Sequence, residues 1–369
     1  MRGDNIQICK ECLTPSSRPR VEFNHEGICN ACVYSKEKNS IDWEDRQTKL
    51  MEILESVKSN SGYHCVVPFS GGKDSASIAY KLKFEYGLNP LLVTFSPLIP
   101  NEVGEINRQK FVDLGFDHVM FRANGRVARS LARRFFIERG NPKVAWDAGI
   151  NATPVTCAIE KAIPVIFYAE HGETEYGGKV LHEESSMIRD FTEVIEHQIG
   201  DHPLNWMNSD INETELLPYA YPEANWHQIT AYYFAYFHNW SMYNNYEFVK
   251  DKYDFMTCPQ GRTSGTFTNF DSLDDKIDDL YYYLQYVKFG FGRCVRDASR
   301  LIQNNHITRE EGLDFVKKYD GEFPSRYLNE VLDYLSLNFG AFMDIIEKHR
   351  NEELWVKCNG NWKLRFDYK

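Results

Sequence analysis

The sequence lacks the features that would place it in a membrane or outside the cell. No apolar run approaches the roughly 18 residues that cross a bilayer as a helix. The first residues lead directly into a cysteine-rich segment, without the apolar stretch of a secretory signal. These absences predict a cytoplasmic protein that has no membrane partner.

Positive charge is also scarce. Lys and Arg together number 42 against 53 Asp and Glu, which gives a formal net charge of −11. Proteins that bind long nucleic acids usually present a basic surface, because binding neutralises phosphates. We therefore expect no nucleic-acid partner. The charge balance suits an enzyme for small molecules that keeps its positive charge inside the site.

The nine cysteines do not suggest a disulfide framework, because their number is odd and the chain is expected to be cytoplasmic. Four of them form two Cys-x-x-Cys pairs, Cys9 with Cys12 and Cys29 with Cys32, separated by sixteen residues. This spacing is typical of a zinc ribbon. Four protein ligands leave no open coordination position, so the Zn²⁺ is expected to be structural. Unmetallated thiols and an iron–sulfur cluster are the alternatives.

Strands alternate with helices after this cysteine unit. Strand patterns at 65–69, 90–95, 118–121 and 163–168 are separated by helical patterns at 75–86, 104–114 and 126–139. Such alternation predicts an α/β fold, in which a doubly wound parallel sheet is covered by helices on both faces. The pattern weakens from about 180 to 265, and residues 272 to 350 read as helices. Ser272 and Thr308 are candidate first residues of two of these helices, each as part of a capping box.

One hexapeptide connects the first strand to the first helix of this pattern and predicts a phosphate site. The free N–H groups and the dipole of a helix N-terminus attract anions, and a glycine pair lets the backbone turn tightly around them. A carboxylate in such a loop would repel phosphate unless it holds Mg²⁺. The loop is not a Walker A motif, because its lysine comes directly after the glycine pair. A glycine-rich turn without a ligand is the alternative. The expected nucleotide-binding residues are Ser70, Gly71, Gly72, Lys73, Asp74, Ser75 and, on the second strand, Thr94.

Acidic residues follow the strand at 163–168. Carboxylates at the carboxyl end of a parallel strand lie where ligands bind, so Glu170 and Glu173 are candidates to hold Mg²⁺ or to orient an incoming amine. The alternative is a solvated acidic loop. Tyr176 is a candidate substrate contact in the same stretch.

Two further stretches carry arginines next to glycines and hydroxyls. The first contains Arg262 and Thr263, and the second contains Lys288, Arg293 and Arg296 around a pair of glycines. Arginine binds carboxylates and diphosphates bidentately, so these residues are candidate substrate contacts. Each glycine in a helical stretch costs roughly 1 kcal/mol, which suggests a local purpose for the pair. An exposed basic helix end is the alternative.

The phosphate hexapeptide within a doubly wound sheet resembles the PP-loop ATP pyrophosphatases, and the whole chain resembles the N-acetyl sugar amidotransferase family. The resemblance covers most of the chain, with the weakest part from about 180 to 255. One departure is Ala169-Glu170-His171, where the family leads us to expect Gly-Glu-Asn. The resemblance is carried by Cys29-Asn30-Ala31-Cys32, the hexapeptide 70–75, Glu175-Tyr176-Gly177-Gly178, Gly261-Arg262-Thr263, Ser272-Leu273-Asp274-Asp275-Lys276-Ile277-Asp278, Lys288-Phe289-Gly290-Phe291-Gly292-Arg293, His306-Ile307-Thr308-Arg309-Glu310-Glu311 and Tyr319-Asp320-Gly321-Glu322-Phe323-Pro324.

The resemblance implies an activity and an organisation. The expected enzyme uses ATP and Mg²⁺ to adenylate the acetamido oxygen of an N-acetyl sugar, releases pyrophosphate, and installs ammonia to form an acetamidino sugar. Such sugars occur in lipopolysaccharide O-antigen, other surface polysaccharides and flagellar glycans. The expected catalytic residues are Lys73, Asp74, Glu170 and Glu173. The expected divisions are a zinc-ribbon unit at 1–40, a PP-loop domain at 41–215 and a mainly helical substrate or partner region at 216–369.

Ammonia is expected to come from a separate glutaminase subunit, as the resemblance implies, because none of the cysteines lies in a Gly-x-Cys-x-Gly setting. Two other functions stay open. A PP-loop tRNA thiolase with structural zinc would share the ribbon and the loop, and a non-catalytic scaffold would share the helices.

Overall fold

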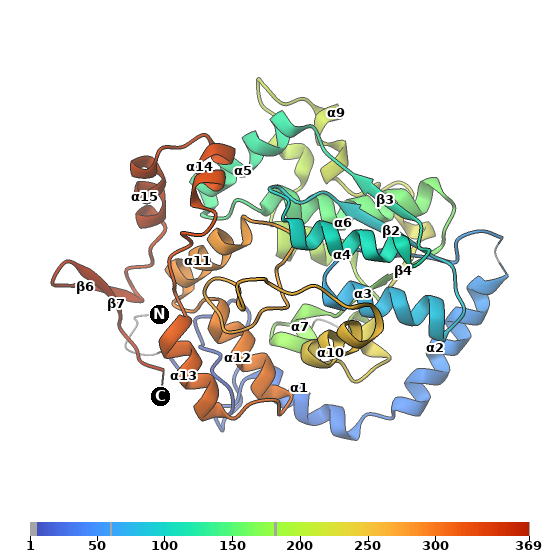
Figure 1. Ribbon diagram of the computed structural model, residues 1–369, viewed down its shortest axis with the longest axis horizontal. Coiled ribbons are helices and arrows are strands. Elements are labelled where there is room, and N and C mark those ends of the chain that lie inside the picture. Colours follow the sequence, from blue (N-terminus) through green and yellow to red (C-terminus); the bar gives the residue numbers. More distant parts are fainter. Residues whose placement is uncertain (1–5, 60, 181–182, 369) are drawn as a thin grey trace.

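The computed structural model describes residues 6–59, 61–180 and 183–368. A parallel five-stranded sheet lies at its centre, and helices pack on both faces (Figure 1). The predicted α/β class with a parallel sheet is confirmed. In spatial order the strands are β3 (His118–Phe121), β2 (Pro90–Phe95), β1 (Cys65–Pro68), β4 (Val165–Tyr168) and β5 (Thr230–Tyr233).

The strand order reverses between β1 and β4. From β1 the chain first moves outward through β2 to β3, and then returns to place β4 on the other side of β1. Loops that leave the carboxyl ends of two such strands diverge toward opposite faces and open a crevice, which is the usual ligand site of this architecture. The residues after β1 and after β4 are therefore the ones that the fold places at a binding site.

Strand β1 contributes to both hydrophobic layers. Val67 packs into the core under the first group of helices, and Val66 packs into the core under the second group. Apolar side chains on successive residues are expected when both faces of a parallel strand are buried. The first group is α2 (Trp43–Lys58), α3 (Lys73–Tyr80), α4 (Glu102–Asp113) and α10 (Met242–Tyr253), and the second is α5 (Gly125–Arg139) and α6 (Val144–Glu160).

The sheet extends further along the chain than the sequence pattern suggests. Strand β5 and helix α10 lie beyond the expected division at residue 215, yet β5 pairs with β4 and α10 packs against α3. The strand lies in a run of mostly aromatic residues at 232–237 and lacks an alternating pattern, because Tyr232 and Tyr233 pack into the cores on opposite faces. Helix α6 is likewise not predicted, and it contains Pro154.

Shorter helices connect the sheet to the C-terminal part, which is mainly helical. Gly290 ends α11 (Asp278–Phe289) in the left-handed conformation with φ of 74°, and Gly292 precedes α12 (Arg293–Gln303), so the glycine pair forms the turn between these helices. Thr308 caps α13 (Arg309–Tyr319) with the predicted capping box. The prediction for Ser272 is wrong, because this residue lies in a loop with φ of 51° and α11 begins at Asp278. The remaining elements are α7 (Gly172–Tyr176), α8 (Phe191–Val194), α9 (Glu213–Leu216), α11 (Asp278–Phe289), α12 (Arg293–Gln303), α13 (Arg309–Tyr319), α14 (Leu328–Leu335), α15 (Phe339–Lys348), β6 (Trp355–Cys358) and β7 (Asn361–Leu364).

The cysteine unit lies at the N-terminal end of α1 (Asn30–Glu37) and packs against α12 and α13 (Figure 1). Its four predicted ligands are buried, and their Sγ atoms all lie within 4.8 Å of one another. The Leu13 N–H donates to Ser299 Oγ at 3.3 Å, and Arg309 Nε donates to the Cys12 carbonyl at 3.2 Å. A four-thiolate cluster of this kind is suited to structural Zn²⁺. Within the described ranges, no helix combines the length and apolarity needed to cross a bilayer.

Candidate active site

The loop that the sequence predicts to bind phosphate, residues 70–75, leaves β1 at the point where the strand order reverses, and we call it the phosphate loop. Gly71 has φ of 84°, and a Cβ at this position would lie 2.7 Å from Arg108 Cγ and 3.0 Å from the Gly104 carbonyl oxygen. Gly72 is the N-cap residue of α3 and, as a glycine, has no side chain to cap the first N–H groups of the helix. The loop therefore combines a turn that only glycine fits with an uncapped helix N-terminus.

A buried arginine supports this loop from behind. Arg108 on α4 is 3% exposed, and its Nη1 donates to the Ser70 carbonyl at 2.7 Å. Within the loop, the Gly72 N–H donates to Ser70 Oγ at 3.1 Å, and Ser75 Oγ donates to the Gly72 carbonyl at 3.2 Å. These bonds fix the shape of the loop.

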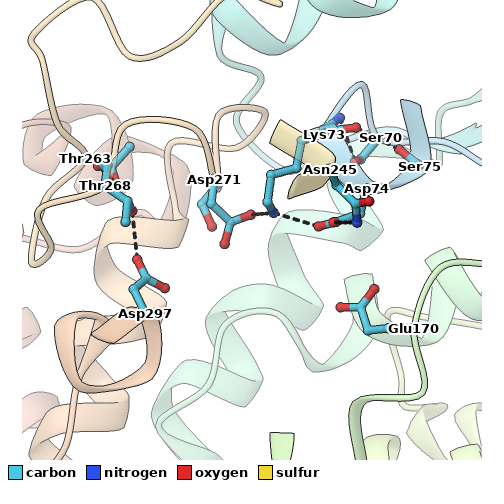
Figure 2. A network of polar contacts seen from close by, with 12 residues as sticks. Ser70, Lys73, Asp74, Ser75, Glu170, Asn245, Thr263, Thr268, Asp271 and Asp297 are labelled. Atoms are coloured by element: carbon cyan, nitrogen blue, oxygen red, sulfur yellow. Dashed lines mark hydrogen bonds and ion pairs between the residues drawn. The ribbon is translucent and has the colours of Figure 1, made fainter. Parts of the chain in front are cut away.

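Lys73 lies between two carboxylates. It is 2% exposed, and its Nζ is 2.6 Å from Asp74 Oδ2 and 3.1 Å from Asp271 Oδ1 (Figure 2). Burial alone would lower the pKa of Lys73, but Asp271 and Asp74 outweigh it and raise the pKa above its ordinary value. The other oxygen of Asp74 accepts from Asn245 Nδ2 at 2.9 Å. Asn245 therefore orients Asp74 at the edge of the loop.

Asp271 connects Lys73 to the arginines of α12. Its Oδ2 is 2.6 Å from Arg296 Nη2 and 3.6 Å from Arg293 Nη2. Burial opposes ionisation of Asp271, but Lys73, Arg296 and Arg293 outweigh it and hold its pKa well below the usual range. Asp297, which is fully buried, completes the network: it accepts from Thr266 and Thr268 at 2.8 Å each.

The two predicted substrate arginines on α12 are thus already engaged by carboxylates. Arg293 Nε pairs with Asp297 at 3.2 Å, and Arg296 bridges Asp297 and Asp271. Their observed contacts position Asp271, and through it Lys73. The contact to a substrate that the sequence predicts for them stays a prediction.

Glu170 and Glu173 lie in different surroundings. Glu170, two residues after the end of β4, lies near Asp74 (Figure 2). It lines the cleft next to the loop and accepts from the Tyr176 hydroxyl at 3.1 Å. Burial and the charge of Asp74 raise the pKa of Glu170. Glu173 instead pairs with Arg20 at 3.3 Å, against the cysteine unit. The structure therefore brings Glu170 to the phosphate loop and leaves Glu173 outside it.

His171 and Tyr176 are packed residues beside Glu170. His171 stacks on Tyr233 with ring centroids 4.6 Å apart, and burial lowers its pKa to about 4. The ring of Tyr176 lies under Arg300 at 3.3 Å from its guanidinium carbon. The hydroxyl of Tyr176 reaches Glu170, so its observed contact orients that carboxylate.

Two adjoining clefts cover this end of the sheet. The first, about 230 Å³, is lined by residues 70–75, Gly104 and residues 270–274, and the second, about 390 Å³, lies along the ends of β2 and β4. They share Ser70, Trp146, Ala169 and Asp274, so a ligand can extend from one into the other. We call them the loop cleft and the sheet cleft.

Thr94 lines the sheet cleft, where its hydroxyl donates to the Phe69 carbonyl and lies 2.8 Å from His118 Nε2. Three other predicted contacts lie outside both clefts and have protein partners. Arg262 forms two bonds with Glu322, at 2.6 and 2.8 Å, Thr263 donates to the Thr268 carbonyl at 3.3 Å, and Lys288 donates to the Arg139 carbonyl at 2.8 Å.

Several site residues are missed by sequence reasoning. Asn245, Asp271, Asp274 and Asp297 come from segments far from the loop, and no local motif predicts their roles. Asp274 lines both clefts, and burial together with the charge of Asp278 raises its pKa to about 7. Only the fold brings these side chains to residues 70–75.

The C-terminal part of this site lies in a segment that matches the model of a known protein family. Residues 264–367 match the family model described as "LPS biosynthesis protein WbpG-like, C-terminal domain". We call them the WbpG-like segment. It supplies Asp271, Asp274, Arg293, Arg296 and Asp297, so the segment related to lipopolysaccharide biosynthesis proteins contributes one wall of the loop cleft.

A curated relative extends this comparison only a little. An uncharacterized protein of Methanocaldococcus jannaschii is 38% identical over 88 residues, which are 23% of this chain. The match spans 31% of that protein, so the chain covers less than a third of its relative's length. The name of that protein assigns it no activity.

Proposed function

We propose that the protein is an ATP-dependent amidotransferase that converts the N-acetyl group of a sugar into an acetamidino group, for lipopolysaccharide or a related surface glycan. The observation that carries this proposal is the loop at the β1–β4 crevice, in which Lys73 lies between Asp74 and Asp271. The WbpG-like segment supports the biosynthetic setting.

The chemistry requires activation of a poor electrophile. The acetamido oxygen attacks the α-phosphorus of ATP, the bond from that phosphorus to the bridging oxygen breaks, and pyrophosphate leaves. Ammonia then adds to the imidate carbon, and the C–O bond breaks, so that AMP departs with the former acetyl oxygen. The product is an amidinium cation that holds the sugar's nitrogen and the nitrogen of ammonia with three of their four N–H protons, and the fourth proton is released to a base.

The loop suits the first of these steps. The uncapped N–H groups of α3 and the charge of Lys73 face the position where the leaving pyrophosphate gains negative charge. Asp74 is the carboxylate that would hold Mg²⁺ together with substrate phosphates, and the ion would neutralise charge on those phosphates. Thr94 and the sheet cleft would take the nucleoside.

Glu170 is the proposed base for the second step. Its carboxylate lines the sheet cleft beside the phosphate loop and accepts from the Tyr176 hydroxyl at 3.1 Å, where it would accept a proton from ammonium. We further propose that a separate glutaminase delivers the ammonia. Of the cysteines outside the four-cysteine cluster, Cys65, Cys157, Cys258 and Cys294 are buried.

An isotope experiment tests this proposal. The enzyme is given ATP, Mg²⁺, ammonium chloride and an N-acetyl sugar labelled with ¹⁸O in its acetyl group, and the nucleotide products are analysed by mass spectrometry. We expect ¹⁸O in AMP, together with unlabelled pyrophosphate. Ammonium chloride replaces the glutaminase, so the result does not depend on the proposed partner.

Variants localise the reaction. Asp74→Asn is expected to lower AMP formation by at least about a hundredfold, because it removes the charge that would hold the metal. Asp113→Asn, an exposed carboxylate on α4, is the matched control. Label in inorganic phosphate with release of ADP, or no transfer of label to AMP, would refute the adenylation step.

A further inference from the structure

The cysteine unit, residues 6–40, holds the turn that follows α7, and its helix α1 lies beside both α7 and α12 (Figure 1). Asn30 Nδ2 donates to the Gly178 carbonyl at 2.6 Å, and Arg18 Nε donates to the Gly177 carbonyl at 3.1 Å. Arg20 Nη2 donates to the carbonyl that follows these two, at 3.0 Å. Side chains of the cysteine unit therefore bind three successive carbonyls after α7.

This contact is close enough to require a glycine. Gly177 has φ of 80°, and a Cβ there would lie 2.8 Å from Asn30 Oδ1 and 3.2 Å from Ala31 Cβ. Asn30 directly follows Cys29, a predicted metal ligand whose N–H donates to Cys9 Sγ at 3.3 Å. A metal that links the four thiolates would thus fix the residue that binds the turn.

Two ion pairs attach α7 itself to the cysteine unit. Arg20 Nε is 3.3 Å from Glu173 Oε2, and Lys38 pairs with Glu175. The second pair is buried, since each side chain is 5% exposed, and Lys38 also donates to the Trp240 carbonyl at 3.0 Å. Separating a buried pair leaves uncompensated charges, which is costly. Helix α7 is therefore held to the cysteine unit along its length as well as at its end.

Helix α7 in turn orients Glu170. Its last residue, Tyr176, donates from its hydroxyl to Glu170 Oε1 at 3.1 Å. The guanidinium carbon of Arg300 lies 3.3 Å from the centroid of the Tyr176 ring, so this ring is packed from the side of α12. The connection from the four cysteines to Glu170 thus consists of one turn, one short helix and one hydrogen bond.

The phosphate loop is held by other parts of the fold. Arg108 on α4 donates to the Ser70 carbonyl, and Asn245 on α10 donates to Asp74. Among the described residues, no side chain of the cysteine unit bonds to residues 70–75. The cysteine unit is therefore attached directly to the half of the site that contains Glu170, and not to the loop.

We propose that the cysteine unit positions Glu170, so that metal in the four-cysteine cluster controls the capture of ammonia and leaves the cleavage of ATP unchanged. The inference rests on the proposed function for the role of Glu170. Asn30 and Tyr176 are positioning residues, because they act on the reaction through that carboxylate. The metal cluster thereby sets the second step of the reaction.

Hydrogen exchange followed by mass spectrometry tests this connection without substrate. Asn30→Ala removes the bond to the Gly178 carbonyl and keeps all four cysteines. We expect at least about threefold faster exchange at residues 170–179 in this variant, and in wild-type protein from which a chelator has removed the metal. Residues 70–80 should keep the wild-type exchange rate in both proteins.

Asn89→Ala is the matched control, because it removes a bond of the same kind, from a side-chain amide to the Gly62 carbonyl. This control should leave exchange at residues 170–179 unchanged. Unchanged exchange there in Asn30→Ala, or equally faster exchange at residues 70–80, would overturn the inference. The cysteine unit would then act on no part of the site, or on all of it.

Turnover separates positioning from general stability. The substrate is an N-acetyl sugar that transfers ¹⁸O to AMP, and ammonium chloride supplies the ammonia. In Asn30→Ala and Tyr176→Phe, pyrophosphate release in the first turnover should stay within about twofold of the wild type, whereas amidine formation at limiting ammonium should fall at least about fivefold. Tyr176→Phe should keep the wild-type exchange rate, because it removes only the hydroxyl.

The two proposals can fail separately. If no N-acetyl sugar transfers ¹⁸O to AMP, the proposed function fails, and the exchange experiment still decides whether the cysteine unit holds residues 170–179. If the label is transferred and Asn30→Ala slows both steps alike, the inference fails and the proposed function stands.

Discussion

Replacement of Gly71 by alanine tests two requirements at the first glycine of the phosphate loop: a positive φ and the close approach of α4. The backbone there has φ of 84°, and an added Cβ would lie 3.0 Å from the Gly104 carbonyl oxygen and 3.3 Å from the Arg108 backbone nitrogen, besides 2.7 Å from Arg108 Cγ. The side chain of Arg108 can shift, but the two backbone atoms belong to α4 and cannot move away cheaply.

The expected cost has two parts. An alanine with positive φ costs roughly 1–2 kcal/mol, and overpacking against a fixed neighbour costs about 1–3 kcal/mol more. Gly87 provides the matched control, because its φ is 71° and a Cβ there would meet nothing within 4 Å. Gly87→Ala should therefore show the conformational cost alone, and the difference between the two variants isolates the close approach.

The assay is urea unfolding followed by tryptophan fluorescence, with pyrophosphate added in a second series. Gly71→Ala should lose about 2–5 kcal/mol of unfolding free energy in total. Pyrophosphate should stabilise the wild type and Gly87→Ala, and should have little effect on Gly71→Ala. If Gly71→Ala loses no more stability than Gly87→Ala and still responds to pyrophosphate, the reasoning about this loop is wrong.

Three further outcomes follow from the structure. Cys12→Ser should lower both the zinc content, measured by atomic absorption, and the thermal unfolding midpoint, because one of four buried ligands is lost. The control Cys358→Ser replaces a half-exposed cysteine and should change neither quantity. Asp271→Asn should lower the free energy of unfolding, measured with urea, by about 3 kcal/mol, because it leaves the buried Lys73 with one carboxylate fewer. Added pyrophosphate should restore part of this stability. Equal stability of the variant and the wild type would contradict the role of Asp271. Burial lowers the pKa of His238 to about 4 from 6.5, so the folded state resists protonation and stability is lost as pH falls from 6.5 toward 4. His238→Gln should reduce the slope of unfolding free energy against pH in that window by up to about 1.4 kcal/mol per pH unit, and an unchanged slope would contradict the burial argument.

The parts of the site that sequence alone predicts are those with a local physical cause. The phosphate loop depends on a strand, a glycine pair and a helix start within ten residues, and the cysteine cluster depends on two short turns with fixed spacing. Both patterns are read along the chain, and the structure places both as compact units. The capping box at Thr308 is local in the same sense.

Other assignments depend on contacts between distant segments. Arg296 looks like a substrate contact in the sequence, but folding brings it to Asp271, 2.6 Å away. Glu170 and Glu173 look alike in the sequence, and the turn into α7 sends one toward the loop and the other toward Arg20. Local pattern cannot distinguish these outcomes, because the partner of each charge lies far away in the chain.

The sequence by itself determined the alternation that builds the sheet, the glycine turn between β1 and α3, and the cysteine spacing, because each depends on backbone geometry over a few residues. Only the tertiary structure decided which charges meet. Lys73 receives Asp271 from the C-terminal segment, whereas Glu173 receives Arg20 from the cysteine unit. Electrostatic neutralisation in a buried site depends on distances of a few ångströms between segments that packing alone brings together.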